Sequence, residues 1–117
     1  MARKILDQVE QATAANTTTN NVFTGRRFER APFSGFLALY STGSAAGLEV
    51  ELNIGGMSIM PRVPINVQNR QPVVPDDMLI QGVEVYEGQL IQLTQVNTTA
   101  GALTGRHRFE IEEGVFV

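Results

Sequence analysis

The sequence predicts an all-β protein, an antiparallel β-sandwich with a short N-terminal helix and an extended arm. From about residue 35 onward, apolar and polar residues alternate in short segments. Glycines and prolines separate these segments about every eight to twelve residues, and no helical pattern lies between them. The first thirty residues differ, because five basic and three acidic residues give them a charge of +2, whereas residues 31–117 carry −5.

The clearest strand is Leu48–Ile54, where every second residue is apolar and the residues between them are polar. Gly55-Gly56 follows and predicts a two-residue turn, because glycine tolerates positive φ at both positions. Met57–Met60 is then the returning strand. Gly35–Ser41 is apolar on both faces, which is typical of a strand covered on both sides. Its two faces consist of Leu37 and Leu39 on one side and Phe36, Ala38 and Tyr40 on the other.

The segment 61–77 contains four prolines and predicts an edge or loop, with one short strand at 65–67. Met78–Tyr86 alternates with a phase shift at Gly82, so we expect a β-bulge there. The remaining predicted strands are Leu90–Val96, Gly105–Glu112 with His107, Phe109 and Ile111 inward, and Val115–Val117. Seven or eight short strands favour a jelly roll as the first choice and another Greek-key sandwich as the second.

Residues 1–30 are predicted to form the N-terminal arm, and residues 31–117 the sandwich domain. Over Ala2–Ala15, Ile5, Val9 and Ala12 recur at helical spacing and predict an amphipathic helix. A helix of about 14 residues needs a surface to dock on. Three possibilities stay open: docking on its own domain, docking on a neighbouring subunit, or a frayed end. The polar residues 16–21 predict an extended linker.

Arg26, Arg27 and Arg30 lie among three phenylalanines. Arginine interleaved with aromatic residues binds phosphate or single-stranded nucleic acid in some proteins and acidic protein surfaces in others. Because residues 31–117 are acidic, a protein interface is the favoured interpretation, and a solvated loop is the remaining alternative. The candidate interface residues are Ile5, Val9, Arg26, Arg27, Arg30, Phe36 and Tyr40.

The sequence offers few residues for catalysis or metal binding, and we expect no enzyme and no cofactor. Cysteine is absent and His107 is the only histidine, which excludes thiolate sites and sites with two histidines. The inward parity of His107 predicts a core or rim position. Asp76-Asp77 lacks the further acids of a calcium loop and predicts a turn. No long apolar run or secretory signal is present, so we expect no membrane partner.

Three features carry a resemblance to a known group of proteins. They are the Asn/Thr-rich stretch Thr17–Asn21, the cysteine-free composition without catalytic residues, and the run Val83–Thr99 followed by Arg106–Ile111. Together they resemble the small virion structural proteins of tailed bacteriophages, in particular jelly-roll head decoration (cement) proteins. The resemblance implies trimers on a capsid, an arm that reaches onto the major capsid protein, and a location in the virion after synthesis in the host cytoplasm.

We therefore expect a non-enzymatic structural protein that decorates or cements a capsid shell. One alternative is a carbohydrate- or host-surface-binding module, which predicts exposed aromatic residues on loops or on a concave face. Another is a small shell subunit made of a single jelly roll, for which the arm is weakly basic. The net charge of −3 argues against nucleic acid as the main partner.

Overall fold

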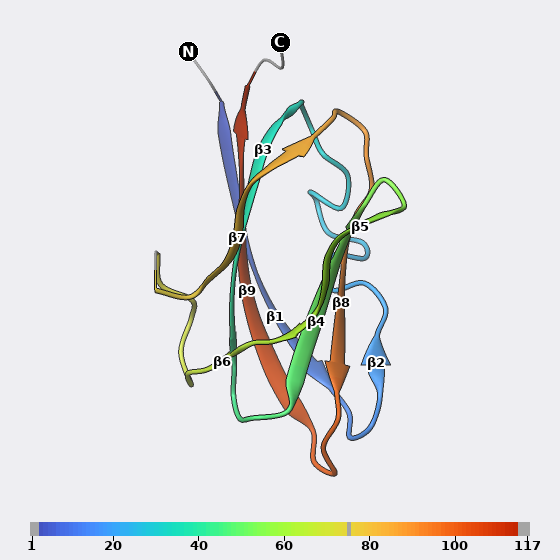
Figure 1. Ribbon diagram of the computed structural model, residues 1–117, viewed down its shortest axis with the longest axis vertical. Helices are drawn as coiled ribbons and strands as arrows, with labels where there is room; N and C mark the ends of the chain where they lie inside the picture. Colours follow the sequence, from blue (N-terminus) through green and yellow to red (C-terminus); the bar gives the residue numbers. More distant parts are fainter. Residues whose placement is uncertain (1–2, 75, 115–117) are drawn as a thin grey trace.

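Two β-sheets pack face to face in a sandwich (Figure 1). The computed structural model describes residues 3–74 and 76–114, and all the regular structure in this part of the chain is β. The all-β sandwich predicted from the sequence is therefore confirmed.

Sheet A contains the strands that are farthest apart in the sequence. Its order is β1 (Lys4–Thr13), β9 (Leu103–Glu113) and β3 (Gly35–Gly43). The far edge of β3 is shared by β7 (Met78–Val85), which is antiparallel to it, and β6 (Asn66–Val67), which is parallel. The edges of this sheet are therefore β1 on one side and β7 with β6 on the other.

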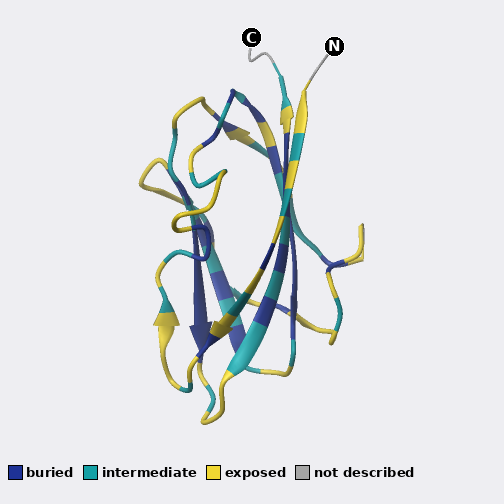
Figure 2. Ribbon diagram, turned by 180° about the vertical axis from the view of Figure 1, so that it is seen from behind, coloured by how far each residue is buried: buried dark blue, intermediate teal, exposed yellow. Residues whose placement is uncertain are grey.

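Sheet B is antiparallel throughout. Its order is β2 (Thr18–Thr19), β8 (Ile91–Asn97), β4 (Leu48–Ile54) and β5 (Met57–Pro64). β8 is buried along almost its whole length, whereas β1 alternates between exposed and more buried residues (Figure 2). The edge strand β5 carries Pro61 and Pro64, which lack the N–H that a central strand would need.

The core lies between the sheets and follows the predicted alternation. All four apolar residues of β4 are buried, and Phe109 and Ile111 of β9 face them as predicted. Phe23 joins this core from a loop, with its ring centroid 4.7 Å from that of Phe109. Burying such apolar surface is the main favourable contribution to folding.

The helix predicted over Ala2–Ala15 is wrong, because Lys4–Thr13 forms β1 and pairs with β9 along its length. Ile5 and Val9 are four residues apart, a spacing that fits one helix face and also one strand face. Asp7 lies between them on that strand face and is accommodated because it forms an ion pair with Arg26. Pairing with a distant strand thus overrides the local pattern.

The residues predicted as an extended arm belong to both sheets and to their common core. Thr18–Thr19, in the predicted linker, forms β2 at the edge of sheet B. Val22 and Phe23 are buried among the core residues. The described part of residues 1–30 therefore packs within the sandwich.

The other predicted strands agree with the structure, with small shifts at their ends. Gly55 and Gly56 both have positive φ in the β4–β5 turn. The bulge at Gly82 is also present: Gly82 has φ 69°, and the register between β3 and β7 shifts beside it. β5 continues to Pro64, four residues beyond the predicted end. The strand predicted at Val115–Val117 lies outside the described residues.

Candidate interface on the outer face of sheet A

The outer face of sheet A, which points away from sheet B, carries a row of side chains across four strands. The register places Lys4 opposite Glu112, Glu112 opposite Phe36, and Phe36 opposite Glu84. Residues paired in this way have their Cβ atoms about 5 Å apart on the same face. Phe36, which is 39% exposed, thus lies between two glutamates in the register. We call Glu84, Phe36 and Glu112 the acidic row.

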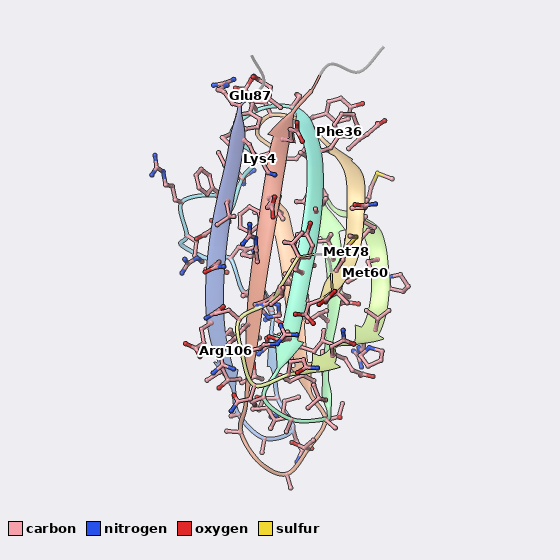
Figure 3. The ribbon with its side chains drawn as sticks, turned by 90° about the vertical axis from the view of Figure 1, so that its left-hand side faces the viewer. Lys4, Phe36, Met60, Met78, Glu87 and Arg106 are labelled. Atoms are coloured by element: carbon pink, nitrogen blue, oxygen red, sulfur yellow. The ribbon has the colours of Figure 1, made fainter. Side chains whose placement is uncertain are left out.

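A groove of about 500 Å³ lies beside this row on the same face. Phe36 and Tyr40, both predicted as interface residues, line it together with Ala38 between them on β3. Leu37 of β3 also lines it, and the neighbouring strands contribute Lys4, Gln81, Gly82, Glu110 and Glu112. Figure 3 shows this face, with Lys4 and Phe36 toward one end and Arg106 toward the other.

Ion pairs hold the wall of the groove on β9. The Glu110 carboxylate lies 2.8 Å from Lys4 Nζ and 2.9 Å from Arg108 Nε, and its side chain is only 9% exposed. Burial raises the pKa of Glu110, but the hydrogen bonds from Lys4 and Arg108 outweigh this effect and hold the pKa below its ordinary value. The hydrogen bond to Glu110 in turn raises the pKa of Lys4. The wall is therefore charged at neutral pH and fixed in place.

Residues 68–74 and 76–77 lie over the other half of the same face. Asp77 is 2% exposed, forms an ion pair with Arg70 and accepts a hydrogen bond from the Val73 N–H. Thr42 of β3 donates to the Arg70 carbonyl and fastens the loop to the sheet. Burial raises the pKa of Asp77, but the hydrogen bonds from the Val73 N–H and from Arg70 outweigh this effect and hold the pKa below its ordinary value. The loop limits the groove to the end of the face that contains Phe36.

The structure separates the seven predicted interface residues. Ile5 packs against the core and Val9 is buried in it. Arg26 makes a bidentate contact with Asp7, with both N–O distances at 3.0 Å. The other four form two pairs: Phe36 and Tyr40 in the groove, and Arg27 and Arg30 on the loop of residues 24–30, which we call the arginine loop.

Sequence reasoning missed the three charged residues Lys4, Glu84 and Glu112. Glu84 and Glu112 lie in predicted strands, but Lys4 lies in the segment predicted as a helix, and the sequence does not show which strands pair. The pairing of β1 with β9 and of β3 with β7 brings them together, and no local pattern specifies such long-range pairing.

A buried chain of hydrogen bonds links the two sheets at His107. Ser41 Oγ lies 2.7 Å from His107 Nδ1, and His107 Nε2 lies 2.7 Å from Gln95 Oε1. The Gln95 amide nitrogen donates to the Gln11 carbonyl, so its oxygen accepts and the proton of the imidazole is on Nε2. Burial lowers the pKa of His107 to about 3, which keeps the ring neutral.

This arrangement resembles a nucleophile with its base, but it is closed to substrate. Ser41, Gln95 and His107 are all 0% exposed. A general base acts only on a substrate within hydrogen-bonding reach. The network therefore holds the sheets together, and of the core or rim position predicted for His107 the structure shows the core.

A second groove, of about 480 Å³, lies on the open side of the sandwich between β5 and β7. Met57 and Tyr86 line it and are 69% and 50% exposed. Glu84 and Gln89 supply polar groups at the same place. It therefore combines apolar surface with a few polar atoms, as binding grooves do.

Two kinds of site find no support among residues 3–74 and 76–114. No group of three His, Cys, Asp or Glu residues is placed to hold a metal ion in this part of the chain. No helix there is long and apolar enough to cross a membrane.

Comparison with protein-family models, curated proteins and solved structures finds no match to the chain. The geometry above is therefore the basis for the function.

Proposed function

We propose that this chain is a non-enzymatic structural subunit that binds other protein subunits through the outer face of sheet A. The observation that carries the proposal is the groove in which the two sheet residues predicted for an interface, Phe36 and Tyr40, lie together. Apolar surface between charged side chains is typical of protein interfaces. The groove walls are fixed by ion pairs, so that little ordering is needed on binding.

The strand order supports a jelly-roll assignment for the sandwich. Leaving out the two-residue β6, the eight strands pair in nested fashion: first with last, second with seventh, third with sixth, fourth with fifth. This is the pattern of one long antiparallel hairpin rolled into two sheets. Jelly rolls are the fold of viral capsid and lectin domains.

The proposed setting is a virion, where the subunit would decorate or cement a capsid shell as a homotrimer bound to the major capsid protein. The setting comes from the resemblance of the sequence to tailed-bacteriophage decoration proteins. A subunit that binds only the assembled shell stabilises it by mass action. The sequence predicted that an N-terminal arm would contact the capsid. Because β1 and β2 are parts of the sheets, we assign these contacts to the outer face of sheet A instead.

The test is to block the groove by replacing Ala38 with arginine. Ala38 lies on β3 between Phe36 and Tyr40, so a long cationic side chain there fills the groove without touching the core. We expect light scattering to show a discrete oligomer for the natural chain and a monomer for Ala38→Arg. Ala46→Arg, at an exposed position in the β3–β4 loop, is the matched control and should keep the natural mass. An unchanged mass for Ala38→Arg would rule out this face as the interface.

The second groove favours one other function, the binding of carbohydrate. A half-exposed Tyr86 lies there with Glu84 and Gln89, and exposed aromatic residues were the expectation for that alternative. An amphipathic aromatic ring next to polar groups suits a ligand with one apolar and one polar side. Binding to a glycan array that disappears in Tyr86→Ala, with the oligomer intact, would favour this function over assembly.

A further inference from the structure

The two carboxylates of the acidic row lack an ion-pair partner within the described residues, and Lys4, the cation opposite Glu112, is paired with Glu110 instead. Glu84 and Glu112 are exposed and neither forms an ion pair there, whereas Glu110 in the same sheet is paired twice. Both are paired with Phe36 in the strand register. A carboxylate accepts two hydrogen bonds from a guanidinium. The row therefore has the chemistry to bind arginine.

The arginine loop offers two guanidinium groups that meet no carboxylate in the described structure. Arg26 is engaged with Asp7, but Arg27 lies over the ring of its neighbour Phe28, 5.3 Å from the centroid. Arg30 donates to the neutral Gly88 carbonyl at 3.1 Å. Both side chains are exposed. The loop thus carries the charge that the acidic row lacks.

Within one copy of the chain these two surfaces do not meet, because Arg27 and Arg30 make their contacts with Phe28 and Gly88. The arginine loop is held along β1 and β8, through the contact of Arg26 with Asp7 and the hydrogen bond from the Ile91 N–H to the Glu29 carbonyl. Glu84 lies on β7, at the opposite edge of sheet A from β1. A contact between the row and the loop therefore needs a second molecule.

We infer that the acidic row of one copy binds Arg27 and Arg30 of a second copy, an inference that rests on the proposed assembly function. Complementary charge on two separate surfaces selects a copy of this same chain as the occupant. Because the two surfaces differ, the contact is head-to-tail, and such contacts either close into a ring or extend into a filament. A closed ring is the form that a trimer would take.

The experiment exchanges the charges of the two surfaces. One variant carries Glu84→Lys with Glu112→Lys, a second carries Arg27→Glu with Arg30→Glu, and a third carries all four changes. Sedimentation velocity over a range of concentrations gives the association constant of each. We expect each double variant to associate at least about tenfold more weakly, because like charges then face each other. The fourfold variant should return to within about threefold of the natural chain, since opposite charges face each other again.

Two further samples sharpen the result. An equal mixture of the two double variants should associate more strongly than either variant alone, because each supplies the complement of the other. Glu49→Lys with Glu51→Lys makes the same change of charge on the outer face of sheet B and should leave association unchanged. Thermal unfolding checks that every variant is folded; all the exchanged side chains of the two surfaces are exposed.

The outcomes separate this inference from the proposed function. Double variants that dissociate without recovery in the fourfold variant would overturn the pairing of row and loop. Double variants that associate normally, while Ala38→Arg does not, would overturn the pairing and leave the sheet face as the interface. A natural chain that is monomeric at every concentration would overturn both.

Discussion

The side chain of Gln95 on sheet B forms hydrogen bonds to three residues of sheet A. Its oxygen accepts from His107, and its nitrogen donates to the Gln11 carbonyl and to Thr13 Oγ1. Gly105 on β9 makes this possible, because a Cβ atom there would lie 2.0 Å from Gln95 Oε1. The absence of a side chain at Gly105 thus leaves the space in which the amide and the imidazole meet.

Replacing Gly105 with alanine should lower the free energy of unfolding by about 2–4 kcal/mol, because the added methyl group displaces Gln95 and leaves buried polar atoms without partners. Urea denaturation followed by circular dichroism measures the change. Gly101→Ala is the matched control, since its Cβ would meet no atom within 4 Å. Equal stability of the two variants would show that the network tolerates the displacement.

At the scale of elements, β1 is held to the sandwich both by its strand partner and by the arginine loop. Asp7 of β1 accepts from two nitrogens of Arg26, and the hydrogen bond to Asp7 raises the pKa of Arg26. Arg26 also donates to the Gln8 carbonyl on the same strand. The arginine that was predicted for an interface therefore serves in the described structure to fix an edge strand.

A double-mutant cycle on Asp7 and Arg26, with each replaced by alanine alone and together, should give a coupling energy of about 0.5–1 kcal/mol. The value is modest because the pair is partly exposed to solvent. The coupling should shrink in 1 M salt. A coupling near zero at low salt would mean that the two side chains stabilise the fold independently.

The sequence predicts elements well where alternation and turn residues agree. Leu48–Ile54 is found with both its ends correct, and Gly55-Gly56 forms the predicted turn. Lys4–Thr13 was mistaken for a helix because Ile5 and Val9 suit both structures and the partner that decides between them lies about a hundred residues away. For the same reason Phe36 and Tyr40 could be proposed from one strand, whereas Glu84 and Lys4 could not.

At the scale of the whole molecule, the two sheets form one unit whose stability depends on a neutral imidazole between them. The pKa of His107 is about 3 in the folded protein and about 6.5 in an unfolded chain. Below pH 6.5 the unfolded state therefore binds a proton that the folded state does not. The free energy of unfolding falls as the pH falls from 6.5 toward 3.

Between pH 7.5 and pH 5 this loss should amount to about 2 kcal/mol. The carboxylates of lowered pKa, Asp77, Glu110 and Glu113, reduce stability only at lower pH, where an unfolded chain begins to protonate them. Urea denaturation at several pH values tests the slope, and His107→Gln should remove it in this range. Because His107 is the only histidine, its C2–H signal in NMR can be followed directly and should stay constant from pH 8 to pH 5. A midpoint inside that range would contradict a closed core.

The pairing of β1 with β9 also governs the order of events during synthesis. β9 lies between β1 and β3, so that sheet A lacks its middle until β9 has left the ribosome, after every other described strand. Until then β1 has no neighbour, and an emerging chain exposes the apolar residues that the sandwich will cover. Such distant pairing makes folding slow, on the scale of milliseconds to seconds. A nascent chain of this protein therefore depends on the finished translation of β9, and products cut short before β9 should be targets for chaperones and proteases.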